Sequence, residues 1–497
     1  MDLILGLDAG SSVCKAAVFD LAGRVVSSAS TQMPVSRPGE GRVEADPNGV
    51  WHSACHAIKG AVAGAAGRGQ IIGMGVTGAM VGAWVIGAHG EILRPGIIWE
   101  DSRAQALIDA MVAERPTLYS DIFAVSGSVM QQGCTLPVVA SLMQSEPEIM
   151  AEARAVIGLK DWLRMKLTGE IATDRSEAAV APGDARLNRR SQAMFDLFAL
   201  GDHKDLFPTP KASQEIAGTV TEAASRLTGL PAGLPVAVGA GDVIANVIGA
   251  GGLRPGSITS ILGTTCMVGL CHDEPVFEPP DIGLLFPMPE SHWFRAMVNV
   301  AGTLNLDWAV SLFYPDLAKD NDRNTKVTTL ADAVPIGSRG VTYLPYLSES
   351  GIIAPVADAE ARAQFAGLTP LHGPADMIRA VYEGVAFSIA DLCDLLTRSS
   401  DEPLVLTGGG ASSPLWHAMI AEVTGRPVTV PDGGEFGARG AALLAGVAIG
   451  RFSSVVEASA TVAGGGRTVV PTGKDAAAWS AARTQYTRTR DRALMRD

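Results

Sequence analysis

The same strand–turn–strand pattern occurs twice in this chain, once at its start and once near its middle. Residues 3–19 form two short apolar runs separated by the turn Asp8-Ala9-Gly10-Ser11-Ser12, and residues 257–270 repeat this order around Gly263-Thr264-Thr265. Apolar runs bounded by glycine and hydroxyl residues predict buried strands joined by tight turns. With a length of 497 residues, the repetition favours two related α/β domains over a single core.

Apolar spacing and punctuation by Gly and Pro predict the other elements. The first strands form an antiparallel meander over 3–30, and a helix begins at Asp46-Pro47. Further helices are expected at 103–113, 135–144, 159–167, 373–397, 412–425 and 438–450, and further strands at 71–77, 82–86, 235–239, 404–407 and 428–430. We place the domain boundary near 240–250, which gives domains 1–246 and 247–497.

Composition narrows the classes of partner. The net charge of −13 argues against a nucleic-acid partner, which needs a basic face. The longest apolar run, near 440–450, is too short for a bilayer span of about 20 residues. The six cysteines are scattered without a C-x-x-C pair, and no secretory signal is seen, so we expect a cytoplasmic protein with reduced thiols and no membrane partner.

The two glycine turns are candidate phosphate sites. Backbone N–H groups, hydroxyls and a lysine can together hold phosphate, and an Asp at the strand end can hold Mg²⁺. The residues concerned are Asp8, Gly10, Ser11, Ser12 and Lys15 in the first turn and Gly263, Thr264 and Thr265 in the second. Either turn alone is equally an ordinary hairpin. Two such turns in matching places of two halves favour a nucleotide triphosphate such as ATP between them.

Asp242 is the candidate catalytic carboxylate. It follows Gly239-Ala240-Gly241 where a predicted strand ends. Phosphoryl transfer to an alcohol needs a carboxylate within hydrogen-bond reach of that hydroxyl, and positioning does most of the remaining work. The alternative is a helix N-cap, which is a common place for Asp.

A third glycine junction follows the predicted strand at 404–407. Gly408-Gly409-Gly410-Ala411-Ser412 leads from this strand into a helix, a junction that can accept adenosine or phosphate. It lacks the G-x-G-x-x-G spacing and the acidic partner of a dinucleotide site, which disfavours a dehydrogenase. The alternative is a loop that only permits a close backbone crossing.

The run Trp99-Glu100-Asp101-Ser102-Arg103 has the residue types of a sugar site. Carboxylates and guanidinium groups bind hydroxyls, and an aromatic side chain forms a wall. The alternative is a helix capped by Asp101 with Arg103 on the surface. The histidines form no zinc-like cluster and no G-x-S-x-G elbow occurs.

Taken together, these motifs resemble the FGGY family of carbohydrate kinases over nearly the whole chain. The resemblance rests on the opening at 6–12, on Val43-Glu44-Ala45-Asp46-Pro47, on 99–103, and on Thr173-Asp174 followed by Ser176-Glu177. Its most specific part is 363–368 followed by 376–383, which fits the C-terminal signature of that family position by position.

The resemblance implies a fold, a reaction and a set of roles. The fold is α/β, with two actin-like, ribonuclease-H-type domains flanking a nucleotide and sugar cleft. Asp242 would be the base that prepares a sugar hydroxyl for the γ-phosphate of ATP, and Asp8 and Asp242 would lie near Mg²⁺. The first two turns would hold the phosphates, and Gly408, Gly409, Gly410 and Ala411 the adenosine. The acceptor would be faced by Thr77, Met80, Val81, Trp99, Asp101, Arg103 and Val243.

The acceptor is less constrained than the reaction. Gly78-Ala79-Met80-Val81 replaces the Asn-Gln-Arg-Glu run of glycerol-kinase-like members, and only Met80 remains of the Gln-Met-His typical of D-xylulose kinases. Val243 after Asp242 and the run 383–388 are similar to the L-xylulose branch. We therefore expect a xylulose-like pentulose, with L-xylulose, erythritol, ribulose and glycerol as alternatives. A non-catalytic sensor and a sugar-independent ATPase are the competing classes, and the sequence permits a homodimer without showing one.

Overall fold

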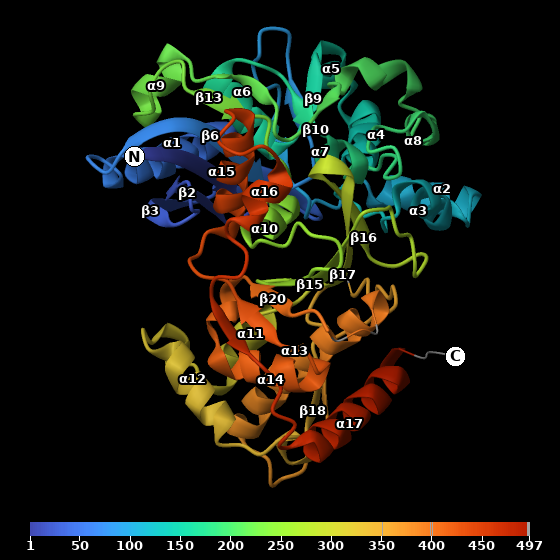
Figure 1. The fold of residues 1–497 in the computed structure, drawn as a ribbon. Helices are drawn as coiled ribbons and strands as arrows, with labels where there is room; N and C mark the ends of the chain where they lie inside the picture. The colour runs from blue at the N-terminus through green and yellow to red at the C-terminus, as the bar shows by residue number, and fades with distance from the viewer. Residues whose placement is uncertain (350, 398, 400, 495–497) are drawn as a thin grey trace.

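The computed structural model describes residues 1–349, 351–397, 399 and 401–494. It contains two large mixed sheets in two lobes (Figure 1). The first sheet has the order β12-β13-β6-β1-β2-β3 and the second β16-β17-β15-β14-β20-β21-β22. The strands of the first are β1 (Asp2–Ala9), β2 (Val13–Asp20), β3 (Val25–Gln32), β6 (Gln70–Gly78), β12 (Ile216–Thr219) and β13 (Pro235–Ala237). Those of the second are β14 (Ile258–Leu262), β15 (Cys266–His272), β16 (Leu284–Met288), β17 (His292–Asn299), β20 (Leu404–Thr407), β21 (Val428–Val430) and β22 (Arg467–Val469).

The two sheets share one topology, as the repeated sequence pattern predicts. In each, the first strand pairs antiparallel with the strand that follows the glycine turn, β1 with β2 and β14 with β15. On its other side, the same strand pairs parallel with a later one, β1 with β6 and β14 with β20. The turn therefore lies where the central parallel strands end, and this edge is the usual ligand site of such sheets.

Helices cover the sheets and fill the connections between strands. Those of the first half are α1 (Pro47–Gly64), α2 (Gln105–Glu114), α3 (Leu118–Ser126), α4 (Thr135–Ser145), α5 (Pro147–Glu152), α6 (Leu159–Thr168), α7 (Arg175–Val180), α8 (Gln192–Leu197), α9 (Glu222–Thr228) and α10 (Asp242–Gly249). Those of the second are α11 (Leu304–Phe313), α12 (Arg323–Asp332), α13 (Pro374–Leu396), α14 (Pro414–Thr424), α15 (Phe436–Ala448), α16 (Val455–Ala460) and α17 (Ala476–Leu494). Short strands complete the fold: β4 (Val35–Gly39), β5 (Arg42–Ala45), β7 (Trp84–Ile86), β8 (Gly96–Ile97), β9 (Ala155–Ile157), β10 (Thr173–Asp174), β11 (Pro210–Lys211), β18 (Thr342–Leu344) and β19 (Gln364–Ala366).

The predicted elements are confirmed, with two local differences. Asp46 caps α1 by accepting a hydrogen bond from the Gly49 N–H at 2.8 Å. The helix expected from residue 103 begins at Gln105, so Asp101 is not its cap. A 3₁₀ turn at Gly409–Ser412 separates the third glycine junction from α14, because Ser413 and Pro414 start that helix anew.

Helix α15 comes from the second half of the chain but packs on the first sheet. Figure 1 shows it beside the strands of the first lobe. The approach is so close that a Cβ added at Gly6 or Gly75 would lie 1.8 or 1.9 Å from a carbonyl oxygen of the helix. Only glycine permits this contact between strand and helix. The boundary between residues 246 and 247 therefore stays a prediction, because the first lobe also holds a late helix.

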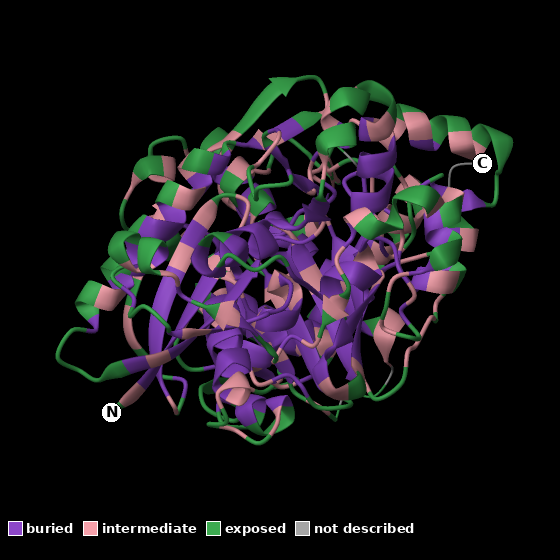
Figure 2. Ribbon diagram, turned by 90° about the horizontal axis from the view of Figure 1, so that it is seen from above, coloured by how far each residue is buried: buried purple, intermediate pink, exposed green. Residues whose placement is uncertain are grey.

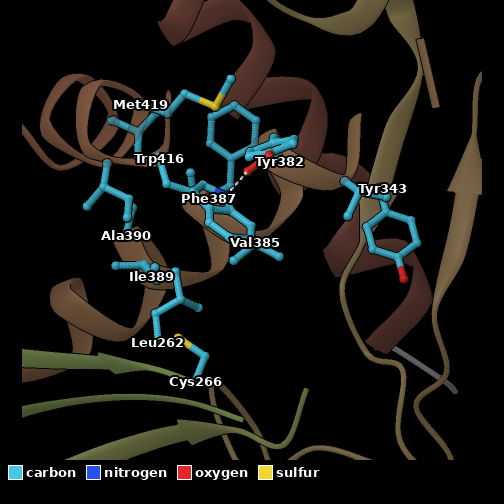
Figure 3. Packing of buried hydrophobic residues seen from close by; sticks show 14 of the residues in the cluster. Leu262, Cys266, Tyr343, Tyr382, Val385, Phe387, Ile389, Ala390, Trp416 and Met419 are labelled. Atoms are coloured by element: carbon cyan, nitrogen blue, oxygen red, sulfur yellow. Dashed lines mark hydrogen bonds between the residues drawn. The ribbon is translucent and has the colours of Figure 1, made fainter. Parts of the chain in front are cut away.

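Buried side chains fill the interior of both lobes, and the outer helices expose one face (Figure 2). In the second lobe, the rings of Tyr382 and Trp416 lie 4.7 Å apart, and the Trp416 indole N–H donates to the Tyr382 carbonyl (Figure 3). Leu262 and Cys266 belong to this same core. Since these two residues flank the second glycine turn, the core fixes both ends of that turn.

The six cysteines are buried free thiols. Within the described residues, no helix has both the length and the apolar character that crossing a membrane requires.

Candidate active site

Asp8 and Asp242 form an electrostatically coupled pair at the carboxyl ends of the first sheet. Asp8 lies at the end of β1, and Asp242 is the first residue of α10, after the N-cap Gly241. Burial raises the pKa of Asp8 to about 6. Burial and then the charge of Asp8 raise the pKa of Asp242 to about 7. Two carboxylates that repel each other in a desolvated site are poised to take up a proton or a cation.

The loop after β6 connects these two acids. Residue Gly78 forms a parallel bridge with Gly241, and the Ala79 N–H donates to the Ala9 carbonyl at 2.9 Å. The Thr77 hydroxyl donates to the Ala240 carbonyl at 2.7 Å. The structure therefore brings the predicted sugar loop 77–81 against the residues on either side of the acid pair. Thr77 itself is fully buried and serves this backbone contact.

An apolar surface lies beside Asp242. Met80 packs so closely on Gly241 that a Cβ there would lie 2.2 Å from the Met80 sulfur. Met80 belongs to a hydrophobic cluster against which Val81 and Val243 are packed, both partly exposed. These three predicted acceptor residues therefore share one hydrophobic cluster beside Asp242, and their side chains carry no hydrogen-bonding group.

Trp99 joins the predicted acceptor site to the first phosphate turn. Its indole N–H donates to the Ser11 hydroxyl at 2.8 Å, although 88 residues separate the two in the chain. Both residues are partly exposed. The contact fixes the plane of the indole relative to the turn 8–12.

Asp101 and Arg103 lie in a buried ion-pair network instead of an open surface. Asp101 is 0% exposed, and its carboxylate accepts from the Val43 N–H at 2.7 Å and from the Arg103 guanidinium at 2.8 Å. Arg103 also donates to Glu44, and hydrogen bonds from Arg103 and Arg94 hold the pKa of Glu44 below its usual value. This geometry ties Asp101 to the backbone of β5 and to Arg103, and the sequence did not predict this buried network.

The second glycine turn and the third glycine junction meet at the second sheet. A Cβ at Gly408, whose φ is 84°, would lie 2.5 Å from the Leu262 carbonyl and 3.0 Å from the Gly263 nitrogen. The Gly263 N–H donates to the Thr265 carbonyl, which closes the turn. Thr264, Gly409 and Ser412 are exposed, Gly410 and Ala411 buried. The predicted phosphate and adenosine segments are thus adjacent.

A loop after β17 also contacts the second glycine turn, and the sequence did not predict this contact. The Gly302 and Thr303 N–H groups donate to the Thr264 and Gly263 carbonyls at 2.6 and 2.8 Å. Like Gly263-Thr264, Gly302-Thr303 is a glycine–threonine pair that follows an apolar strand. That likeness to Gly263-Thr264 is the signal that could have identified it.

Helix α10 connects the acid pair of the first sheet with the third glycine junction of the second sheet. Asp242 begins this helix, and Asn246, one turn later, accepts a hydrogen bond from the Thr407 hydroxyl at 2.9 Å. Thr407 directly precedes Gly408. Since one helical turn rises about 5.4 Å, the acid pair and the third glycine junction lie at opposite ends of a short, rigid connection.

The start of α15 adds a charged residue that the sequence did not identify. The Lys15 ammonium lies 3.2 Å from the Glu435 carboxylate. Glu435 has φ 55°, a left-handed conformation that is uncommon for a residue other than glycine. A Cβ at the next residue but one, Gly437, would lie 2.2 Å from the Asp8 carboxylate. Strained residues cluster at functional sites, and Asp432-Gly433-Gly434 before Glu435 was the available signal.

The acid pair suits a magnesium ion that is shared with a nucleotide. Mg²⁺ in such sites takes one or two carboxylates together with substrate phosphates and water. Within the described part of the chain, no group of three or more His, Cys, Asp or Glu side chains is arranged to hold a metal. The pKa values of Asp8 and Asp242 are raised because both carboxylates are buried away from water and no neighbouring positive charge fully offsets that burial. Their chemistry therefore fits the cation.

Comparison with known proteins assigns the class. Models of the FGGY family of carbohydrate kinases match the chain over residues 3–249 for the N-terminal domain and 258–449 for the C-terminal domain. The chain belongs to the FGGY family of carbohydrate kinases. It is accordingly an ATP-dependent carbohydrate kinase, and the expected pair of actin-like α/β domains is confirmed.

Individual relatives are similar over almost the whole chain. The xylulose kinase of Escherichia coli K12 is 30% identical over 465 residues, which cover 92% of each chain. The erythritol kinase of Brucella abortus is 29% identical over 474 residues, covering 91% of this chain and 89% of that one. The crystal structure of a xyloylose kinase from Brucella ovis has a TM-score of 0.85 at 29% identity and covers 98% of both chains. The predicted resemblance to the xylulose-kinase-like members is thus confirmed.

Proposed function

We propose that this kinase transfers the γ-phosphate of ATP to a hydroxyl of a pentulose of the xylulose kind, with Asp242 as the base. The observation that carries the proposal is the Asp242 carboxylate. It stands at the start of α10 beside Asp8, next to the loop 77–81, with a pKa raised to about 7. A carboxylate with this pKa is matched to accepting a hydroxyl proton near neutral pH.

The remaining residues divide the work of binding. Lys15, Ser11, Ser12 and Gly10 in the first turn and Gly263, Thr264 and Thr265 in the second would hold the phosphates, and Gly408–Ala411 would lie against the adenosine. Asp8 and Asp242 would hold Mg²⁺, which supplies charge neutralisation for the transferred group. Phosphoryl transfer needs positioning and electrostatic stabilisation above all. Trp99 would form the wall that excludes water from the acceptor.

The apolar surface beside Asp242 supports a weakly polar acceptor pocket. Met80, Val81 and Val243 offer no hydrogen-bonding side chain, so recognition of each hydroxyl would depend on backbone groups and Asp242. Two similar proteins are named xylulose kinase and erythritol kinase, and these names support the same two candidate acceptors. A xylulose-like pentulose is the acceptor we favour, and erythritol is the alternative that the apolar surface also suits. We further propose domains 1–246 for the sugar and 247–497 for the nucleotide, and a cytoplasmic enzyme.

The experiment is an acceptor screen. Purified protein with Mg-ATP is offered D-xylulose, L-xylulose, D-ribulose, erythritol and glycerol, and ADP release is followed. We expect one pentulose to give the highest kcat/KM. Asp242→Ala is the matched control and should bind ATP while losing transfer by several orders of magnitude. If no acceptor raises ADP release above background, the proposal fails, and retained turnover in Asp242→Ala would remove Asp242 from its role.

A further inference from the structure

Two residues in the first turn of helix α7 accept backbone hydrogen bonds from two loops of the site. Glu177 accepts a hydrogen bond from the Val81 N–H at 2.6 Å. The neighbouring Ser176 hydroxyl accepts from the Gly241 N–H at 3.1 Å. Val81 belongs to the loop beside the acceptor surface, and Gly241 directly precedes Asp242. Two consecutive residues therefore each hold a backbone N–H of a different loop of the site.

Val81 needs such support. Its φ is 59°, and a β-branched residue in the left-handed region is strained. Its N–H is oriented toward the Glu177 carboxyl, which is only 5% exposed. Without that acceptor, the conformation that places Val81 on the apolar surface loses a buried hydrogen bond. The loop would then relax toward an ordinary backbone conformation.

A buried ionic network fixes the position of this turn. Asp174 caps α7 by accepting from the Ser176 N–H at 2.8 Å and pairs with the Lys160 ammonium at 2.7 Å. Lys160 also lies 2.6 Å from Asp161, which in turn pairs with Arg164 at 2.8 Å. Lys160, Asp161, Arg164 and Asp174 are all 0% exposed. Breaking a buried pair is costly, so the network holds α7 in one place.

The Glu177 carboxyl has the chemistry of a neutral hydrogen-bonding group. Burial and the charges of Asp161 and Asp174 raise its pKa to about 8, against the opposing effect of Lys160. The raised pKa favours the protonated carboxyl near neutral pH, and this neutral form still supplies an acceptor oxygen to the Val81 N–H. Its second oxygen has no hydrogen-bond partner among the described residues.

We propose that Glu177 and Ser176 are positioning residues of the kinase: Glu177 sets the loop at Val81 that shapes the acceptor surface, and Ser176 sets Gly241 and through it Asp242. The inference rests on the proposed roles of Asp242 and of this loop. Neither residue is proposed to touch the substrate. The positioning proposal predicts that substitutions at Glu177 and at Ser176 change different kinetic parameters.

The test uses three single variants of the full chain. Glu177→Ala removes the acceptor of the Val81 N–H, and Ser176→Ala removes that of the Gly241 N–H. Ser213→Ala is the matched control, because the buried Ser213 hydroxyl donates to Asp174 at 3.3 Å, whereas its bond to residues 239–243 is made by the backbone carbonyl, which accepts from the Gly239 N–H at 2.9 Å and which alanine keeps. Deuterium exchange is followed without ligand in the peptides that contain residues 78–82 and 239–243, and initial rates are measured with the best acceptor of the screen.

Glu177→Ala should speed exchange in 78–82 about tenfold and raise the acceptor KM about tenfold. Ser176→Ala should speed exchange in 239–243 and lower kcat about tenfold, with the acceptor KM within about twofold. The KM for ATP should stay within about twofold in both variants. The proposal is overturned if both variants match Ser213→Ala in exchange and kinetics, or if both change the same parameter.

Glu177→Gln keeps the test decisive if the alanine variant does not fold. Its amide oxygen can still accept from the Val81 N–H, and its neutral amide resembles the protonated carboxyl. Exchange in 78–82 should therefore stay within about twofold of the wild type, and exchange as fast as that of an exposed loop would overturn the proposal. The exchange measurement needs no acceptor. A failed acceptor screen would therefore refute the proposed acceptor, and the exchange rates would still decide whether Glu177 and Ser176 position the two loops.

Discussion

Replacing Asp242 by asparagine should stabilise the ligand-free protein while abolishing phosphoryl transfer. The carboxylate is desolvated and lies within electrostatic range of Asp8, which raises its pKa from 3.8 to about 7. Asparagine has nearly the same shape but carries no charge. Active sites commonly hold groups that function requires and that stability disfavours.

The sign and size of the effect follow from proton linkage. The unfolded chain loses this proton near pH 4 and the folded protein near pH 7, so the folded state binds one more proton between these values. The stability that this group contributes is complete below pH 4 and is lost as the pH rises to 7. Each unit in this window costs about 1.4 kcal/mol. From pH 5 to pH 7, where the slope falls to half at the folded pKa, the wild type should therefore lose about 2 kcal/mol of unfolding free energy that Asp242→Asn keeps.

Urea unfolding followed by tryptophan fluorescence, without Mg²⁺ or nucleotide, measures this difference at pH 5 and pH 7. Asp202→Asn, at an exposed position, is the control and should follow the wild type at both values. Added Mg²⁺ should narrow the gap at pH 7, because the cation stabilises the charged pair only in the wild type. A gap that stays constant from pH 5 to pH 7 would refute the electrostatic account of Asp242.

Three further changes test other parts of the site and the fold. Lys15→Met should raise the KM for ATP about tenfold and leave the acceptor KM within about twofold, because the ammonium is proposed to serve the phosphates; an effect on the acceptor alone would contradict this. Trp99→Phe keeps a ring but removes the indole N–H that Ser11 accepts, so the acceptor kcat/KM should fall about fivefold in initial-rate assays, in line with one hydrogen bond of about 1 kcal/mol. Gly6→Ala places a Cβ 1.8 Å from the Ala438 carbonyl, so β1 and α15 must separate and unfolding free energy should fall by about 3 kcal/mol or more; an unchanged Tm would contradict the close contact.

The elements that the sequence predicts well are those whose signals are local. The two glycine turns, the cap at Asp46 and the main helices depend on residues within a few positions of one another. Their topology also follows, because the same local order in both halves leads to the same pairing of strands. Each acid was identified on similar grounds, Asp8 at the end of a buried strand before a glycine turn and Asp242 after a strand and small residues; that both lie near one cation was implied only by the family resemblance.

What could not be predicted depends on contacts between distant residues. The packing of α15 on the first sheet brings Gly6 against Ala438, and no local pattern connects two backbone segments so far apart. The surroundings of Asp101 could not be predicted for another reason: its residue type suits a sugar, but the fold buries its carboxylate, which accepts from Val43 and Arg103, so its contact with the acceptor stays a prediction. Sequence shows which groups can bind, and only the fold shows which remain free.

Two helices approach the acid pair, in addition to the loop after β6. Asp242 begins α10, and Gly437, in the first turn of α15, lies against the Asp8 carboxylate. Two helix N-termini, each with a partial positive charge, therefore face the pair. Burial nevertheless prevails, because both pKa values are raised. The helices are held in contact at Gly440, where a Cβ would lie 1.8 Å from the Ala245 carbonyl. Since α10 lies at the midpoint of the chain and α15 in its second half, the charge balance of the site depends on both halves being in place, and a ligand that brings positive charge stabilises that arrangement directly.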